Sequence, residues 1–178
     1  GSEMCIRDSL NAVLLYSLLQ KQEHDFHLRL RPVRIAMPVN LRRFFPSKTL
    51  RNFITMVYPS IDPRLGDYTF EEIVTQVHHY MRYYINSKFL RGDITTNAST
   101  QRNPLIRIVP LFLKDFVVRQ FYQRVQDKNS SAGLTNMGAI RVPDDMKPYL
   151  ERFDIYMGIP YSQRTNCAIV SFEDTLTV

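Results

Sequence analysis

Two short segments, residues 32–37 and 52–58, are rich in apolar and β-branched side chains, and each is followed directly by a proline. Such side chains favour strands, whereas proline lacks the backbone N–H that a strand ladder needs and therefore tends to end a strand. The sequence predicts two strands in the first third of the chain. The long stretch between them is expected to be a loop.

Helical periodicity is visible on both sides of these strands. Apolar residues recur at helical spacing over residues 10–20, and again from Ile73 to Tyr84. The second run follows Thr69, a favoured capping residue, and two acids that complement the helix dipole. We expect helices over residues 10–20 and from 70 to about 88.

The rest of the chain is expected to hold a polar loop, one long helix and four more strands. Pro104 starts this helix, and Pro110 is expected to kink or divide it. Asn136 and Gly138 tolerate positive φ, so a tight turn or a bulge is expected where the first two of these strands meet. The predicted loop, helix and strands cover residues 91–103, 104–125, 132–135, 139–142, 153–157 and 166–172.

Size and composition fit one globular domain. The chain has 178 residues, of which 44% are hydrophobic and 22% charged, which allows a core and lies outside the composition of disordered chains. The longest apolar stretch, residues 105–118, is interrupted by three charged residues and is shorter than the ~20 apolar residues of a membrane helix. No secretory signal is recognised. We therefore expect a cytoplasmic α/β protein with helices packed on a mostly buried sheet and without a membrane span.

Residues 1–9, GSEMCIRDS, share no pattern with the rest of the chain. They look like the translation of a transposon-end adapter used in preparing sequencing libraries, so we interpret them as an artefact and expect the native protein to begin near Leu10. Without them the net charge rises from +6 to +7, because one cation and two acids are removed. Cys167 is then the single native cysteine, which excludes a disulfide framework. The true N-terminal part is expected to be missing.

The histidines and the cysteine show no recognisable catalytic or metal-binding pattern. His78 and His79 lie in mid-helix without a neighbouring carboxylate to orient either ring, so we interpret them as a helix-surface pair or as a pair with one core-facing ring. His24 and His27 have no third ligand nearby, and no metal site is predicted. Cys167 lies in an alternating strand without a nearby His or Lys, which favours a buried structural thiol.

The stretch covering residues 28–61 carries seven cations and no acid. Such a cluster attracts phosphates, either of nucleic acid or of a phosphorylated cofactor, and it equally fits a solvated basic face. Arg42 differs from the other cations because Leu41 and the pair Phe44-Phe45 flank it in a proline-bounded loop. A guanidinium buried there would need a carboxylate from elsewhere, since the nearby sequence has none.

Three motifs occur in order along the chain: PVNLRRFFP at residues 38–46, LRNF at 50–53 and LTNMG at 134–138. Together they resemble the C-terminal half of the CoA-dependent acyltransferase superfamily, which shares the chloramphenicol acetyltransferase fold. The similarity is greatest to the bacterial alcohol acetyltransferase-like branch and covers residues 10–178. It implies one lobe of a two-layer α/β sandwich, with a mixed sheet and packed helices, that is incomplete at both ends.

The family's catalytic motif, His-His-x-x-x-Asp-Gly, does not occur in this sequence, and the resemblance places it in a missing N-terminal lobe of the same protein. Its second His is the general base that deprotonates the acceptor. In related families the motif Asp pairs with the arginine of a Val-x-x-Arg motif. Val39 and Arg42 match that motif, which implies Arg42 as the structural partner of the missing Asp.

The resemblance also implies residues near the substrate. Thr135 falls where relatives carry Ser or Thr beside the acyl carbonyl, so its hydroxyl is the candidate oxyanion donor. Asn136 and Gly138 are implied to shape the turn that places Thr135 at the substrate. Asn52 matches a Gly-Asn pair of relatives and is a candidate substrate-binding residue, with Arg51 in place of the glycine.

The expected function is transfer of an acetyl or other short acyl group from acyl-CoA to a small-molecule alcohol, without a metal and without nucleic acid as a partner. The fragment alone is expected to be inactive because the histidine motif lies elsewhere. Two alternatives stay open. One is a condensation-type domain that forms an amide from carrier-bound acyl groups, and the other is a non-catalytic basic interaction module.

Overall fold

The computed structural model describes residues 3–25, 29–50, 52–102, 110–111, 113–115, 119–120, 130–158 and 165–178, with the side chains of 3–6, 97, 98 and 100–102 left out. Its elements follow one another from an N-terminal helix through a mixed set of strands and helices. They are α1 (Glu3–His24), β1 (Val33–Asn40), η1 (Leu41–Arg43), β2 (Ile54–Val57), β3 (Ser60–Ile61), η2 (Pro63–Leu65), α2 (Phe70–Tyr84), α3 (Ser87–Arg102), β4 (Ala132–Ala139), η3 (Asp144–Tyr149), β5 (Asn166–Phe172) and β6 (Thr175–Thr177).

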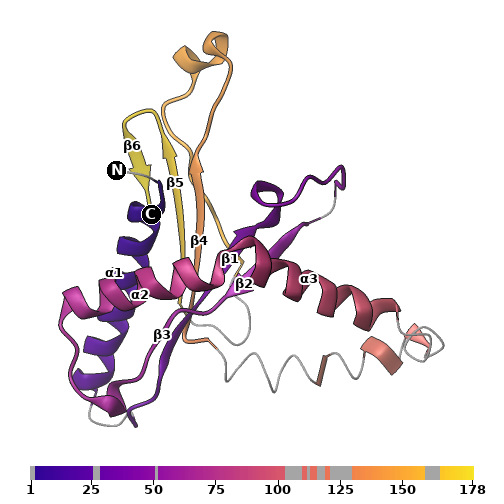
Figure 1. Cartoon of the computed structure of the whole chain (residues 1–178). Helices are drawn as coiled ribbons and strands as arrows, with labels where there is room; N and C mark the ends of the chain where they lie inside the picture. The colour runs from indigo at the N-terminus through magenta and orange to yellow at the C-terminus, as the bar shows by residue number, and fades with distance from the viewer. Residues whose placement is uncertain are drawn as a thin grey trace.

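One mixed sheet organises the chain, with the strand order β2-β1-β4-β5-β6 and with β3 also paired to β1 (Figure 1). β4 lies parallel to both β1 and β5, whereas β2, β3 and β6 are antiparallel to their neighbours. Parallel neighbours need a long crossover, and the chain between β1 and β4 contains α2 and α3. The predicted α/β class, with helices packed on a mixed sheet, is confirmed.

α1 and α2 share one hydrophobic core with the sheet. Leu15 of α1 and Val77 of α2 are buried in one cluster with Ile35, Leu134 and Ile169 of three neighbouring strands. Successive side chains of a strand point to opposite faces, so the residues between these strand positions point the other way. We call the face of the sheet opposite α1 and α2 the distal face.

Two segments extend away from this core. Figure 1 shows α3 leaving the sheet beyond the end of α2, and shows the η3 segment beyond the ends of β4 and β5. Met146 and Tyr149 of η3 are exposed.

Among the helices of the described stretches, none combines the length and the apolar composition that crossing a bilayer requires.

The predicted start of α2 is confirmed by a capping box. The Thr69 side chain accepts a hydrogen bond from the Glu72 N–H, and the Glu72 carboxylate accepts one from the Thr69 N–H. Both bonds satisfy donors that the first helical turn leaves unpaired. The predicted end near residue 88 is wrong, because α2 stops at Tyr84.

The polar loop predicted at residues 91–103 is also wrong, since α3 continues to Arg102. Asn86 explains both corrections, because its side-chain oxygen accepts from the N–H groups of Lys88 and Phe89 and so caps a new helix. The low helix propensity of the Gly, Thr, Asn and Ser residues in α3 concealed this helix. The helix predicted at 104–125 lies largely outside the described residues.

Pro38 does not end β1, contrary to the prediction, and the strand runs on to Asn40. Leu41 donates its N–H to the Phe53 carbonyl on the side of β2. N–H groups alternate between the two sides of a strand, and Pro38 is three residues from Leu41, so an N–H at position 38 would point toward β4. The pairing of β1 with β4, however, stops at Ala36. A proline therefore removes no hydrogen bond of the ladder at this position.

β4 is a single strand, whereas the sequence predicted two strands, at residues 132–135 and 139–142. The sequence allowed either a turn or a bulge between the two predicted strands. The structure has the bulge, because the register of β4 with β5 shifts between Asn136 and Gly138. Gly138 has φ 73°, and the Asn136 Oδ1 accepts from the Gly138 N–H at 2.8 Å. The extra residue is thus absorbed without reversing the chain.

α1 begins at Glu3, so it is longer than predicted and includes residues interpreted as an adapter. Asp8 is only 4% exposed. One of its carboxylate oxygens lies 2.8 Å from Arg7 Nη2, and the other lies 3.2 Å from Nδ1 of His78 in α2. In this chain Asp8 is therefore part of the packed structure, and the adapter origin of residues 1–9 stays a prediction.

We predict that Thr69→Ala lowers the free energy of unfolding by about 1 kcal/mol, because it removes the hydroxyl of the capping box. Urea unfolding followed by circular dichroism measures this change. Thr75→Ala is the matched control, since Thr75 is exposed in the middle of α2, where alanine is the better helix former. An equal loss in both variants would show that the cap contributes nothing.

Candidate functional site

Thr135 lies on the distal face in the middle of the sheet. Its neighbour in sequence, Leu134, belongs to the core on the helix side, so the Thr135 side chain points the other way. The side chain is half-buried, and within the described stretches its hydroxyl has no hydrogen-bond partner. The strand therefore positions the hydroxyl on the distal face.

An alanine and a glycine lie next to Thr135 on this face. The register pairs Thr135 with Ala168 of β5, Gly133 with Asn166 of β5, and Gly133 with Ala36 of β1. Cross-strand partners point to the same face. The direct partner of Thr135 on β5 is therefore an alanine, and the preceding residue on the same face of β4 is a glycine.

Asn166 is a site residue that the sequence analysis did not single out. Its Nδ2 atom is buried and has no hydrogen-bond partner within the described stretches. Cys167, the next residue along β5, packs on the helix side of the sheet. The Asn166 side chain therefore points to the distal face, as Thr135 does. No local pattern marks Asn166, because its proximity to Thr135 depends on the pairing of β4 with β5.

Asn136 and Gly138 form the bulge directly after Thr135. Asn136 pairs with Ile169, which faces the core, so Asn136 and Thr135 point to opposite faces of the sheet. The Asn136 side chain is exposed and accepts a hydrogen bond from the Gly138 N–H. Both residues therefore shape the backbone beyond Thr135. The described contacts assign neither of them a place on the distal face.

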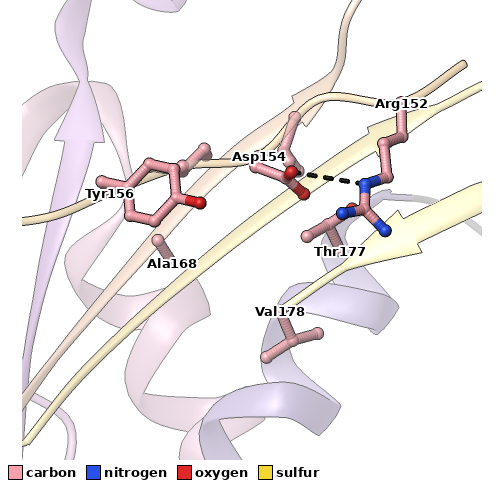
Figure 2. Close-up of a pocket in the computed structure, with 8 residues that line it drawn as sticks. Arg152, Asp154, Tyr156, Ala168, Thr177 and Val178 are labelled. Atoms are coloured by element: carbon pink, nitrogen blue, oxygen red, sulfur yellow. Dashed lines mark ion pairs between the residues drawn. The ribbon is translucent and has the colours of Figure 1, made fainter.

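A cavity of about 240 Å³ lies on β5 and β6, and one of the residues that line it is Ala168, the strand partner of Thr135. Figure 2 shows Tyr156 over Ala168, with the Arg152 Nε and Asp154 Oδ2 atoms of an ion pair, 3.3 Å apart, nearby. The strand predicted at residues 153–157 is not formed. The segment instead packs on β5 through a side chain, since the ring centroids of Phe153 and Phe172 are 5.1 Å apart. The cavity is lined by Arg152, Asp154, Ile155, Tyr156, Ala168, Val170, Thr177 and Val178.

Arg42 lies in η1, directly after β1, at another corner of the sheet. Its N–H donates to the Asn40 side chain, and its Nη2 donates to the Thr49 carbonyl at 2.9 Å. The side chain is exposed, so the buried guanidinium considered from the sequence does not occur within this chain. Asn52, which is also exposed, precedes the Phe53 carbonyl that bonds Leu41, and so it lies at the same corner.

His78 has an orienting partner that the sequence analysis excluded. Asp8 lies 70 positions away in sequence, yet its carboxylate is 3.2 Å from the His78 Nδ1. The pair joins α1 to α2 on the helix side of the sheet, opposite the face of Thr135. Within the described stretches, no group of three or more His, Cys, Asp or Glu side chains is arranged to hold a metal ion. His27 lies outside the described residues.

Cys167 is partly buried and packs against the core, as expected of a structural thiol. Burial raises the pKa of its thiol by disfavouring the thiolate. A nucleophilic cysteine needs the opposite shift. Cys167 therefore gives no support to covalent catalysis.

Comparison with family models, with curated proteins and with solved structures gave no match to this chain.

We predict that Cys167 reacts slowly with iodoacetamide in the folded protein, and that its rate rises with pH to a midpoint above 9.0, the ordinary thiol pKa. The reason is that only the thiolate reacts and burial raises its pKa. A Cys5→Ser variant isolates Cys167, and the same variant in urea is the control. A midpoint below that of the unfolded control would show an activated thiol instead.

Proposed function

We propose that this chain is one lobe of a CoA-dependent O-acyltransferase, with the chloramphenicol acetyltransferase fold, that moves an acetyl or other short acyl group to an alcohol. One observation carries the proposal: the half-buried Thr135 side chain lies on the distal face, and its strand partner Ala168 lines a cavity. A mixed sheet with two helices on one face supports the fold. The motifs around Arg42 and Thr135 support the family.

The proposed reaction is a direct acyl transfer. The acceptor hydroxyl oxygen attacks the thioester carbonyl carbon, while the histidine of the His-His-x-x-x-Asp-Gly motif takes the hydroxyl proton. The carbonyl oxygen becomes an oxyanion that accepts a hydrogen bond from Thr135. Collapse of this intermediate breaks the C–S bond, and the CoA sulfur leaves with the proton held by the imidazolium. An ester and a free thiol are the products.

In this proposal the base comes from a second lobe, because the present sequence does not contain the motif. The chain alone then lacks turnover even when it binds acyl-CoA. The distal face is the side that meets the second lobe, since a base must reach the acceptor beside Thr135. The helix side is already occupied by α1 and α2.

The cavity on β5 and β6 suits the alkyl part of a small neutral acceptor. Ala168, Val170 and Val178 supply apolar walls, while the Thr177 hydroxyl and the Tyr156 side chain add polar groups. The Arg152 and Asp154 charges at the cavity are paired with each other. An uncharged acceptor therefore needs no additional counter-charge there, which favours an alcohol.

A second candidate function, a basic interaction module, rests on the exposure of Arg29, Arg31, Arg42, Arg43 and Lys48. These cations attract phosphates, and affinity for nucleic acid would fall steeply with salt. Binding of DNA or RNA that weakens in this way, together with no binding of acetyl-CoA, would favour this function over acyl transfer.

We predict that Thr135→Val lowers kcat by on the order of 10²–10³ in a chain that also carries the His-His-x-x-x-Asp-Gly lobe, because one oxyanion donor is lost. Thiol release from acetyl-CoA with a short alcohol measures turnover. Thr135→Ser is the matched control and should keep most of the activity, since it keeps the hydroxyl. Unchanged turnover in Thr135→Val would refute the proposed role.

We predict that Arg42→Ala has two different effects, depending on the second lobe. In the present chain the exposed side chain should change the free energy of unfolding by no more than about 1 kcal/mol. Where the motif Asp is present and the pair is buried, the loss should be ~3–5 kcal/mol, together with loss of activity.

Urea unfolding of both forms measures this difference, and Arg43→Ala, a neighbouring exposed arginine, is the control. Equal, small effects of the two substitutions in the two-lobe protein would show that Arg42 does not lie at the interface between the lobes.

A further inference from the structure

Asn166 has a buried amide donor that the described part of the chain leaves unpaired. The Nδ2 atom of Asn166 is inaccessible to solvent and unpartnered within the described stretches. Buried polar groups in native proteins are nearly always hydrogen-bonded, because an unpaired donor loses its hydration without compensation. An exception of this kind calls for a ligand or a water at the amide. The position of Asn166 indicates which ligand.

Asn166 and Thr135 are diagonal neighbours on the distal face. Gly133 is the direct partner of Asn166, and Thr135 is two residues further along the same strand. Neighbouring strands lie about 4.8 Å apart and rise about 3.3 Å per residue, so the two Cα atoms are about 8 Å apart. Gly133 has no side chain to fill the space beside Asn166.

The two side chains offer complementary donors to one oxygen atom. A carbonyl oxygen has two lone pairs, and an oxygen about 3 Å from each donor fits between side chains at this spacing. Thr135 supplies an O–H and Asn166 supplies an N–H. Both are neutral, so they stabilise an oxyanion that forms during reaction without binding a permanent anion strongly.

We propose that Asn166 is a second hydrogen-bond donor, acting with Thr135, to the carbonyl oxygen of the transferred acyl group. This inference rests on the proposed function and adds a residue to it. The Asn166 amide would bond the thioester oxygen in the ground state and the oxyanion more strongly in the tetrahedral intermediate. Asn166 would therefore be a catalytic residue.

The test uses the present chain and acetyl-CoA labelled with ¹³C at the carbonyl. Hydrogen bonding moves a carbonyl ¹³C resonance downfield, and the thioester stays intact because the sequence contains no His-His-x-x-x-Asp-Gly base. We expect a downfield shift on binding, part of which is lost in Asn166→Leu and part in Thr135→Val. Leucine matches the size of asparagine but donates no hydrogen bond.

Asn11→Leu is the matched control. Asn11 is another asparagine with a buried, unpaired side-chain atom, its Oδ1, but it lies in α1, where its Nδ2 donates to Met37 Sδ on the helix side. Its replacement should leave the carbonyl shift of bound acetyl-CoA unchanged. Asn166→Leu should also keep or raise the urea midpoint, because it removes an unpaired buried amide. A purely structural Asn166 would lower that midpoint and leave the carbonyl shift unchanged.

A variant-free measurement covers the case in which Asn166→Leu does not fold. The side-chain amide signal of Asn166 in the ¹⁵N-labelled protein should move with acetyl-CoA and stay in place with CoA alone. Binding of acetyl-CoA with an unmoved Asn166 amide, or with a carbonyl shift that Asn166→Leu retains, overturns this inference and leaves the proposed function standing. Absence of any acetyl-CoA binding overturns both.

Discussion

The parallel pairing of β4 with β5 is the constraint on which the site depends. Leu134 and Ile169 must face the core beneath α1 and α2, and this fixes the orientation of the neighbouring residues in the two strands before the bulge of β4. Thr135 and Asn166 are thereby held on the distal face. A slip of one residue would bury both polar side chains under the helices, so the hydrophobic core maintains the geometry of the candidate site.

The sequence predicted those elements whose signals are local. Thr69 begins α2 through a side chain only three residues from its partner, and β5 keeps its predicted bounds, Asn166–Phe172, because the run of apolar residues that marks it is local. The predictions failed where a tertiary contact decides. β1 continues through Pro38 because its pairing with β4 has ended before that residue. Asp8 of α1 contacts His78 of α2, which lies far away in the sequence.

The candidate site was predicted only in part, for the same reason. Thr135 was found through a motif, but nothing near Asn166 in sequence marks it as a partner, since the two are joined only by the strand register. Arg42 was expected to need a carboxylate because apolar residues flank it in sequence. The structure exposes its side chain instead, so any burial of Arg42 requires a surface beyond the described part of this chain.

Mapping acetyl-CoA onto the chain by ¹H–¹⁵N correlation spectra tests the central claim most directly. The proposed function predicts that the perturbed amides gather on the distal face around Gly133, Thr135 and Ala168, with CoA alone perturbing fewer of them. Perturbations confined to the exposed cations near Arg42 and Arg43 would contradict an acyl site on the distal face. An unchanged spectrum at saturating acetyl-CoA would contradict the acyltransferase proposal itself.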